Sequence, residues 1–386
     1  MSIQFIDLKA QQQRISGAIH KNIARVLEHG QYVMGPEVRA LEERLGAYVG
    51  AKYAVSCASG TDAILMALMA YGVGPGDAVF TSPFTFVATA EVVSLLGATP
   101  VFVDIDPETF NIDPAQLCKA VDALEKKDPS LHPLPRGFEG LRPRGVIPVD
   151  LFGQPADYDA INALAAEKNL FVVEDAAQSF GAEYRGKKAC SLAHVAATSF
   201  FPAKPLGCYG DGGMVFTDDD GIHEALTSVR VHGKGSDKYD NVRIGINGRC
   251  DTIQAAVLLA KFEIFPNEID LRQEVAGRYT ALLEKSPHLR TPVVRQGCLS
   301  AWAQYSLVSE KKDAVMQALK EAGIPTAVYY PRPLHLQGAY AYLGYKPDDF
   351  PVSEGTAGKI FSLPMHPYLT QEDQQRIAEI ILNAVA

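Results

Sequence analysis

The chain has 386 residues, of which 47% are hydrophobic and 21% charged, and its formal net charge is −9. This is the composition of an ordinary globular protein, and the length allows about two domains. An acidic surface repels nucleic acid and anionic membranes, so we expect neither as a partner. No apolar run reaches the roughly 18 residues of a membrane span, and the N-terminus shows no signal peptide pattern.

Six cysteines lie far apart in the sequence, and no two of them form a CxxC pair. This spacing argues against a zinc ribbon and against a disulfide framework. Free cysteines suit a reducing compartment. We therefore expect a cytoplasmic protein without a metal site.

The first 35 residues have weak helical patterning and end at Met34-Gly35-Pro36. Pro36 suits the first position of a helix, because its fixed φ matches the helical value. Apolar residues then recur at three- and four-residue spacing, which predicts one stripe of an amphipathic helix. The stripe consists of Val38, Leu41, Leu45 and Val49.

Short apolar segments that read as strands alternate with helical segments in the following part of the chain. The predicted strands are residues 53–57, 77–81, 99–104, 146–152, 170–175 and 213–217. Helices are expected from about residue 63 and over residues 158–166 and 221–231. This alternation implies a mostly parallel sheet covered by helices. Residues 120–144 interrupt it, and their prolines and charges predict an exposed loop.

A polar, glycine-rich stretch at residues 232–250 precedes the C-terminal part. A long helix from Thr252 and a second from about Asn267 to Leu283 are expected to lead into a smaller domain. Its predicted strands are residues 303–308 and 327–330, and its predicted helices are residues 312–322 and 371–385. We therefore assign residues 1–250 to a large domain, and residues 251–386 to the linking helices and the small domain.

One lysine has an unusual setting. Lys204 lies between Pro202 and Pro205, and glycines and aromatic residues crowd the same segment. An amine among apolar groups favours its neutral form and becomes a better nucleophile towards carbonyls, which suits a Schiff base. Taken alone, a lysine in a Gly/Pro loop is more often an ordinary surface residue.

Three further segments could each hold part of a ligand. The turn Ser59-Gly60-Thr61, between a strand and a helix, presents backbone N–H groups to an anion, although Ser and Thr are also ordinary helix caps. Asp175 ends a buried strand and needs a cationic partner, unless it caps a helix. Phe86 or Phe84 could stack on a planar ligand or belong to the core.

Together these features match the needs of pyridoxal phosphate. Its aldehyde must be tethered, its phosphate bound, its pyridine nitrogen kept protonated and its ring clamped. A carboxylate beside the ring nitrogen makes the ring a better electron sink, and this effect is large in a dry site. The combination indicates a pyridoxal phosphate enzyme.

The chain resembles the DegT/StrS family of sugar-nucleotide aminotransferases, over nearly its whole length. The motifs are Ser59–Asp62, Phe84–Thr89, Glu174–Ser179, Ser199–Lys204 and Gly210–Gly213. The resemblance implies an α/β protein with the aspartate aminotransferase (type I) fold. We expect a large domain with a mostly parallel seven-stranded sheet and a smaller C-terminal α/β domain.

The resemblance also implies roles for single residues. Lys204 is expected to be the Schiff-base lysine and proton carrier, Asp175 the partner of the pyridine nitrogen, and Gln178 the neighbour of the ring hydroxyl. Phe86 is our choice for the stacking residue, with Phe84 second. The expected phosphate ligands are Gly60, Thr61, Ser199 and, from the other subunit, Asn247. A ligand from a second subunit would make a homodimer with shared active sites necessary for activity.

Within the family, the sequence of these motifs is most similar to that of a group of enzymes that aminate C3 of a UDP-linked 2-acetamido-3-keto uronic acid. These enzymes serve the synthesis of 2,3-diamino sugars for bacterial lipopolysaccharide O-antigens, and we expect glutamate as the amino donor. Arg249 is the candidate for the uronate, because a guanidinium grips a carboxylate bidentately; alternatively it anchors its own loop. Weaker candidates for the substrate pocket are Tyr329, Tyr330 and His335, and many relatives have His at the position of Tyr329.

Other functions stay open at this point. One is amination of C4 in a UDP- or dTDP-linked 4-keto-6-deoxy sugar, and another is a non-catalytic regulator that binds pyridoxal phosphate. The presence of both Lys204 and Asp175 argues against the regulator. Dehydratases of the family have His at the lysine position, so Lys204 favours amine transfer. A nicotinamide-binding Rossmann protein has little support, because no GxGxxG follows the first strand.

Overall fold

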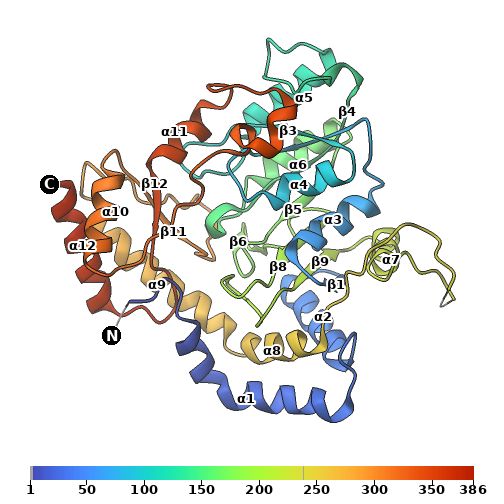
Figure 1. The fold of residues 1–386 in the computed structure, drawn as a ribbon, viewed down its shortest axis with the longest axis horizontal. Coiled ribbons are helices and arrows are strands. Elements are labelled where there is room, and N and C mark those ends of the chain that lie inside the picture. The colour runs from blue at the N-terminus through green and yellow to red at the C-terminus, as the bar shows by residue number, and fades with distance from the viewer. Residues whose placement is uncertain (1–2, 238) are drawn as a thin grey trace.

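Figure 1 shows the computed structural model of the chain, which describes residues 3–237 and 239–386. Two parts of the sequence-based expectations lie outside these residues. They are residues 1–2 of the weakly helical N-terminal stretch and Lys238 of the polar stretch 232–250.

The large domain is built on a seven-stranded sheet with the strand order β1-β9-β8-β5-β4-β2-β3. Only β9 runs against its neighbours, β1 and β8, so the expected mostly parallel sheet is confirmed. Its strands are β1 (Tyr53–Cys57), β2 (Asp77–Thr81), β3 (Thr99–Phe102), β4 (Arg142–Ile147), β5 (Phe171–Asp175), β8 (Val195–Ser199) and β9 (Gly213–Thr217).

Helices cover both faces of this sheet, because alternate side chains of each strand point to opposite faces. In β2, Val79 packs in the apolar cluster under one set of helices, whereas Ala78 and Phe80 pack in the cluster under the other. The first set is α3 (Gly60–Ala70), α4 (Ala88–Leu95) and α7 (Asp220–Val229); the second includes α5 (Pro114–Lys126) and α6 (Tyr158–Glu167). A third cluster joins the sheet to α2 (Pro36–Val49) and α8 (Thr252–Phe262).

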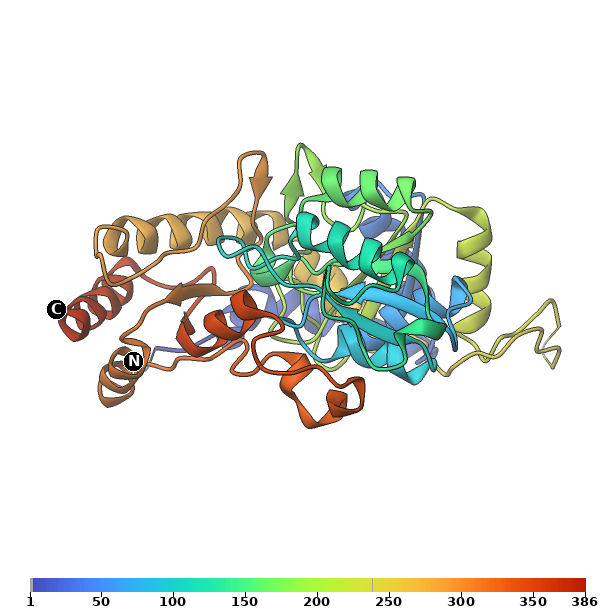
Figure 2. The same cartoon turned by 90° about the horizontal axis from the view of Figure 1, so that it is seen from above.

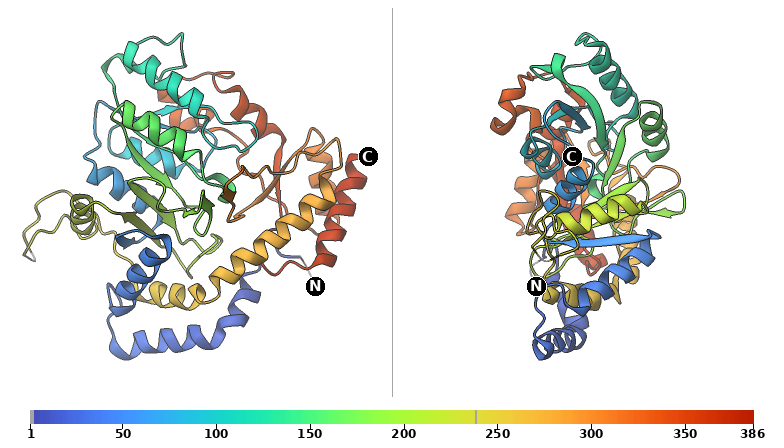
Figure 3. Two further views of the ribbon diagram at one scale, coloured as in Figure 1. Left: turned by 180° about the vertical axis from the view of Figure 1, so that it is seen from behind. Right: turned by 90° about the vertical axis from the view of Figure 1, so that its right-hand side faces the viewer.

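The small domain lies beside the large one, and its orange and red elements occupy one side of the molecule in Figure 2. Its antiparallel strands pack against three helices around Tyr279, Tyr305 and Phe361. The elements are β11 (Tyr305–Val308), β12 (Ile360–Leu363), α9 (Phe265–Leu283), α10 (Lys312–Glu321) and α12 (Gln371–Val385). Figure 3 shows α9 running from the large domain into the small one.

The N-terminal segment connects both domains. Ile3 packs in the small-domain core, and the N–H of Met365 donates to the carbonyl oxygen of Phe5 at 3.1 Å. Helix α1 (Leu8–His29) then runs along α8, where Asn22 donates to the carbonyl oxygen of Ala256. The first described residues are therefore part of the small-domain packing.

A second crossing links the domains at residues 331–353, which return to the large domain. The N–H of Leu334 donates to the carbonyl oxygen of Pro83 at 2.8 Å, and Asp104 accepts the N–H groups of Val352 and Ser353, each at 2.9 Å. This region contains 3₁₀ helices η3 (Leu334–Leu336) and η4 (Gly338–Leu343) and leads into α11 (Pro351–Lys359). Since packing crosses residue 250 in both directions, the domain boundary stays a prediction.

Three expectations about secondary structure are wrong. The strand predicted over residues 146–152 is displaced, because β4 ends at Ile147 and Leu151–Gly153 form the 3₁₀ helix η2. Residues 327–330 are not a strand, because only Ala327 pairs, with Ser362, in an isolated bridge. The exposed loop predicted over residues 120–144 is shorter, since α5 continues to Lys126 on its buried apolar stripe and β4 begins at Arg142. His132 within the loop is buried, and its Nε2 lies 2.8 Å from the carbonyl oxygen of Phe102.

Several short elements were not expected from the sequence. Strand β10 pairs with β6, so a small three-stranded sheet also joins the two parts of the chain. These elements are β6 (Glu183–Tyr184), β7 (Lys187–Lys188), β10 (Cys298–Leu299), η1 (Phe138–Gly140) and η2 (Leu151–Gly153). Within the described residues, no helix combines the length and the apolar character needed to cross a membrane.

Candidate active site

The residues expected to bind the cofactor meet at one edge of the central sheet. β5 ends at Asp175, β8 ends at Ser199, and β1 leads into the turn at Ser59. β5 and β8 are neighbours, and β9 alone separates β8 from β1. Ligands of parallel α/β sheets gather at the carboxyl ends of strands, so this is the expected place for a site.

Lys204 lies in the loop between β8 and β9. The loop closes on itself, because the N–H of Lys204 donates to the carbonyl oxygen of Phe201 at 2.9 Å and the N–H of Phe200 donates to that of Gly212 at 2.7 Å. Burial lowers the pKa of Lys204, and the charge of Asp175 opposes that effect. Among the described residues the amine has no hydrogen-bond partner, so it is free to react with a carbonyl.

Asp175 is 4% exposed and has a donor for each carboxylate oxygen. Thr89 Oγ1 donates to Oδ2 at 2.8 Å, and the N–H of Ala177 donates to Oδ1 at 3.2 Å. Burial raises the pKa of Asp175, whereas Thr89, Ala177 and the charge of Lys204 lower it. No helix begins after Asp175, so it is not a helix cap, and a buried carboxylate without an ion pair fits a protonated ring nitrogen.

Gln178 is held in one orientation by its neighbours. Its Oε1 accepts the N–H of Phe152 at 2.8 Å, and its Nε2 donates to the hydroxyl of Tyr330 at 3.3 Å. The second N–H of the amide remains available for a ligand oxygen. Burial raises the pKa of Tyr330, so this hydroxyl stays protonated and can itself donate.

The turn before α3 forms a cradle beside Ser199. Ser59 caps the helix, since its Oγ accepts the N–H of Asp62 at 3.0 Å, but the N–H groups of Gly60 and Thr61 have no intrahelical acceptor. A Cβ at Gly60 would lie 2.6 Å from the Cβ of Ser199, so only glycine fits there. Both interpretations of this turn hold, because one residue caps the helix while the next two can bind an anion.

The two candidate stacking residues differ in exposure. Phe84 is 1% exposed and packs in the core, whereas Phe86 is 55% exposed. The ring of Phe86 lies 6.5 Å from that of Tyr330, measured between centroids. Phe86 therefore has an open ring face, and Phe84 does not.

Asn247 and Arg249 lie together in the stretch that follows α7. Arg249 Nε donates to Asn247 Oδ1 at 2.8 Å, and Asn247 is exposed. The N–H of Ala58 donates to the carbonyl oxygen of Gly248 at 3.1 Å, which places this stretch beside the turn before α3. Whether these side chains serve a second subunit stays a prediction.

The candidates for the substrate pocket divide into two groups. Tyr329 and Tyr330 are half-buried next to each other, and the ring of Tyr329 also lies 6.4 Å from that of Phe5. His335 is 2% exposed, its Nε2 lies 3.1 Å from Glu354 Oε1, and burial lowers its pKa. The structure thus brings the tyrosines to the site, whereas His335 faces Glu354.

Sequence reasoning missed Thr89, Phe152 and Phe5 as parts of this site. Thr89 belongs to the recognised segment Phe84–Thr89, but its bond to Asp175 depends on how α4 packs against β5. Phe152 contributes through its backbone N–H, which no sequence pattern reveals.

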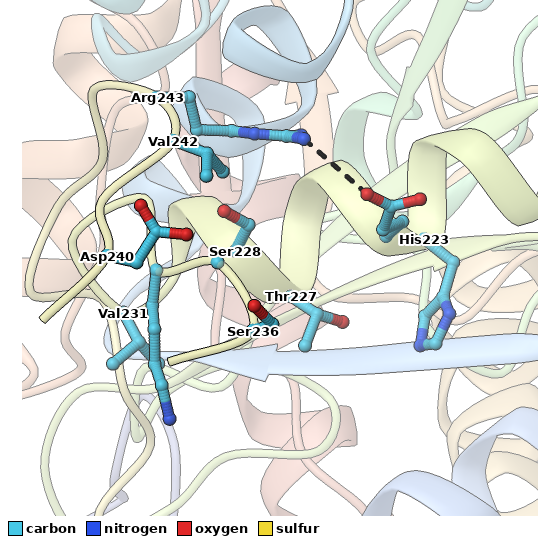
Figure 4. A pocket seen from close by; sticks show the side chains of 11 residues that line it. His223, Thr227, Ser228, Val231, Ser236, Asp240, Val242 and Arg243 are labelled. Atoms are coloured by element: carbon cyan, nitrogen blue, oxygen red, sulfur yellow. Dashed lines mark ion pairs between the residues drawn. The ribbon is translucent and has the colours of Figure 1, made fainter. Parts of the chain in front are cut away.

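A cavity of about 700 Å³ lies elsewhere, between α7 and the stretch that follows it (Figure 4). Its lining includes His223, Thr227, Ser228 and Arg243, and none of the residues expected to bind cofactor or substrate. Arg243 forms an ion pair with Glu224 at 3.7 Å. In the described parts of the chain, no group of three or more His, Cys, Asp or Glu side chains could hold a metal ion.

One lysine, one buried carboxylate and one helix N-terminus therefore converge in an α/β fold, which defines the class of pyridoxal phosphate enzymes. The sequence matches the DegT/DnrJ/EryC1/StrS aminotransferase family over residues 13–382. The chain belongs to this family, and the expected enzyme class and cofactor are confirmed: it is a sugar-nucleotide aminotransferase with pyridoxal phosphate as its cofactor.

Two relatives are similar to this chain over almost their full length. "UDP-2-acetamido-2-deoxy-3-oxo-D-glucuronate aminotransferase" of Pseudomonas aeruginosa is 50% identical over 381 residues, which are 99% of this chain and 100% of the relative. "Pleiotropic regulatory protein" of Geobacillus stearothermophilus is 43% identical over 383 residues, which are 99% of this chain and 98% of the relative.

Solved structures share the fold. A DegT DnrJ EryC1 StrS aminotransferase from Brucella abortus superposes with a TM-score of 0.93 at 48% identity, covering 99% of each chain. Ntda from Bacillus subtilis, described with bound cofactor pmp, has a TM-score of 0.85 at 26% identity, covering 99% of this chain and 83% of that one. These similarities confirm the expected fold.

Proposed function

We propose that the chain transfers an amino group from glutamate to C3 of UDP-2-acetamido-2-deoxy-3-oxo-glucuronic acid, for 2,3-diamino sugars of lipopolysaccharide O-antigen. The observation that supports this substrate is the 50% identity, over the whole relative, to the aminotransferase of that name. The observation that supports the chemistry is the half-buried Lys204 together with the buried Asp175.

The residues present fit pyridoxal phosphate, because Asp175 is a buried carboxylate that forms no ion pair with a described side chain. The N–H groups of Gly60 and Thr61, at the start of α3, have no intrahelical acceptor and can bind a phosphate. When bound, the cofactor supplies a ring that accepts negative charge from the carbon losing its proton. We assign Lys204 to the covalent attachment. Once released from it, Lys204 Nζ takes up and returns the proton, and its lowered pKa favours the neutral amine that this requires.

The other proposed contacts orient the cofactor. Asp175 keeps the ring nitrogen protonated, and the free N–H of Gln178 donates to the ring hydroxyl oxygen. Phe86 stacks on the ring. The N-terminus of α3 would hold the phosphate, because the helix dipole there favours a negative charge; Gly60, Thr61 and Ser199 would be its ligands.

We propose a homodimer in which Asn247 reaches the phosphate and Arg249 reaches the sugar carboxylate of the other subunit. Support comes from the exposed side chain of Asn247 and from large apolar side chains that are exposed on the same two segments as the proposed shared residues. Those on the lysine loop and on the stretch before Asn247 are Phe201, Tyr209, Val242 and Ile244. Apolar side chains gathered on an exposed face are a common mark of a subunit interface.

Tyr329 and Tyr330 complete the proposed sugar pocket from the subunit that holds Lys204. His335 was the third candidate, but its side chain is 2% exposed and lies against Glu354, so we assign it no contact with the sugar. We place the reaction in the cytoplasm, which suits six free cysteines.

The experiment that tests the substrate offers the purified protein a panel of keto nucleotide-sugars together with glutamate. We expect amination of the UDP-linked 3-oxo-glucuronic acid, with the mass of the amine and NMR placing nitrogen at C3. Amination of a UDP- or dTDP-linked 4-keto-6-deoxy sugar in preference would establish the alternative C4 activity.

A second candidate is a regulator, favoured by the name of the relative from Geobacillus stearothermophilus. The two functions separate in a half-reaction with glutamate alone. A transaminase converts glutamate to one equivalent of 2-oxoglutarate per site and loses the visible band of its lysine-bound cofactor. A regulator without catalysis keeps the band and forms no 2-oxoglutarate.

A further inference from the structure

Among residues 3–237 and 239–386, Thr89 is the one side chain that donates a hydrogen bond to Oδ2 of Asp175. It is the second residue of α4, it is 1% exposed, and its Oγ1 lies 2.8 Å from that oxygen. Its own N–H donates to the carbonyl oxygen of Phe86 at 3.3 Å. The N-terminus of α4 therefore contacts both the carboxylate of Asp175 and the backbone of Phe86, the proposed stacking residue.

A second hydroxyl stands behind Thr89. Thr85 Oγ1 lies 3.3 Å from Thr89 Oγ1, one helical turn earlier, and it is also buried. A hydroxyl has a single proton to donate. Because Thr89 gives its proton to Asp175, Thr85 must donate to Thr89. The two threonines thus form a directed chain that ends at the carboxylate, and such chains strengthen each bond.

We propose that Thr89 is a positioning residue that fixes the orientation of the Asp175 carboxylate and holds it in its charged form. Without the hydroxyl, Oδ2 would have no donor from the described protein, in a carboxyl group that is only 4% exposed. The carboxyl group would then bind a proton more readily, and a neutral carboxyl group no longer keeps a ring nitrogen protonated. The consequence for the cofactor rests on the proposed function, whereas the effect on Asp175 itself does not.

Other ionisable groups also act on this carboxylate or respond to it. Lys204 on the lysine loop lowers the pKa of Asp175, and Asp150, after β4, has its pKa raised to about 7 chiefly by burial. The further groups that respond to Asp175 are Tyr158, Cys190 and Tyr330. All of these remain in a Thr89 variant, so their titration cancels when the variant is compared with the unchanged protein.

The first test uses the full-length chain without cofactor and measures the urea unfolding equilibrium from pH 4 to pH 8. Thr89→Val keeps the shape and removes the donor, and the loss of this hydrogen bond to the charged form raises the pKa of Asp175 further. Ionisation of Asp175 then costs more in the folded state. The ratio of the folding equilibrium constant of Thr89→Val to that of the unchanged protein should therefore fall by about tenfold as the pH rises from 4 to 8.

Two comparisons make this test specific. Thr89→Ser restores the hydroxyl and should remove most of the pH-dependent difference, and Thr85→Val, one bond further away, should show a smaller one. A cavity or packing defect at Thr89 changes stability equally at every pH. A difference between Thr89→Val and the unchanged protein that does not vary with pH, or that Thr89→Ser fails to restore, overturns the inference. Thr89→Ala serves as a second variant if valine disturbs folding.

The second test adds pyridoxal phosphate and follows its binding by absorbance. We expect about tenfold weaker binding in Thr89→Val and recovery in Thr89→Ser. If the unchanged protein binds no cofactor, the proposed function fails while the unfolding test still decides the role of Thr89. If the cofactor binds equally well to the unchanged protein and to Thr89→Val, and the stability difference is independent of pH, the inference fails and the proposed function stands.

Discussion

The charges of Lys204 and Asp175 act on one another at the carboxyl edge of the sheet, and burial shifts the two pKa values in opposite directions. It lowers the pKa of Lys204 and raises that of Asp175, while the charge of each residue partly offsets the effect on the other. A neutral amine and a carboxylate beside a cationic ring are the two charge states that amine transfer requires. Substitution of the groups that stabilise these two charge states should therefore change the reaction.

Asp175→Asn should slow turnover by at least about 100-fold, as loss of one preorganised electrostatic group typically does. The amide keeps the shape of the side chain but cannot hold the ring nitrogen protonated. The measurement is the single-turnover rate with glutamate, followed at the visible band. A matched control is Asp220→Asn, an exposed aspartate paired with Lys52, which should leave the rate unchanged. Equal rates in Asp175→Asn and the unchanged protein would contradict the role of Asp175.

Gly60→Ala should weaken the binding of pyridoxal phosphate by at least about tenfold. Its new Cβ would lie 2.6 Å from Ser199 Cβ, so the two proposed phosphate ligands would have to separate. Equilibrium titration with the cofactor measures the effect. Gly277→Ala in α9 is the control, because its Cβ meets nothing within 4 Å. That helix position should gain about 1 kcal/mol of stability, with cofactor binding unchanged.

Asp150 should make the stability of the cofactor-free protein fall as the pH rises. Burial raises its pKa to about 7, and its neighbour Glu174 is likewise raised by burial and by the charge of Asp150. A carboxyl group whose pKa is higher in the folded than in the unfolded protein stabilises the fold at pH values below its unfolded pKa, which is near 4. That stabilisation is lost as the pH rises through the folded-state pKa of about 7. The free energy of unfolding should therefore drop by roughly 2 kcal/mol between pH 5 and pH 8.

Asp150→Asn tests this assignment, because the amide cannot titrate. Urea unfolding of this variant should show a much weaker dependence on pH over the same range. With the amide oxygen at the Oδ1 position, Tyr158 and the N–H of Ala156 keep their acceptor, and Ser179 Oγ can accept from the new amide N–H. An unchanged pH profile would assign the titration to other groups.

Mixing two inactive variants tests the shared active site. In a dimer of Lys204→Ala with Asn247→Ala, one site combines both changes and the other has neither, provided that Asn247 serves the partner's cofactor. Random pairing makes half of the dimers mixed, so activity should return to about a quarter of the unchanged protein. If Asn247 serves the site of its own chain, no mixed dimer has an intact site and no activity returns.

The sheet was predictable because its strands are short apolar runs bounded by turns, as at residues 53–57, 77–81 and 213–217, whose bounds the structure confirms. The helical stripe after Pro36 was equally clear. Such patterns are local, and the structure follows them wherever one face of an element is buried along its whole length.

The errors arose where distant segments decide the structure. Residues 327–330 are apolar enough for a strand, but Tyr329 and Tyr330 turn towards Phe5 and Gln178 and leave no ladder beyond Ala327. The charges around residue 132 suggested an exposed loop, yet the carbonyl oxygen of Phe102 and the ring of Phe350 enclose His132.

The site was predictable only in part for the same reason. Motifs identified Lys204, Asp175 and Gln178, because each lies in a segment whose sequence is specific for the family. Thr89 stands in such a segment too, but its function depends on a contact with Asp175 across 86 residues of sequence. His335 follows the two tyrosines closely in sequence, and its side chain turns into the core beside Phe350.

Borohydride reduction followed by peptide mass spectrometry tests the central claim most directly. The protein is loaded with pyridoxal phosphate, reduced and digested, and the lysine that bears the added cofactor mass is identified. Lys261 is an internal comparison, since it is a fully buried lysine whose pKa is also lowered, to about 8, chiefly by burial. We predict the mass on Lys204 alone, and its loss in Lys204→Ala. A cofactor mass on Lys261 or another lysine, with Lys204 unmodified, would contradict the account.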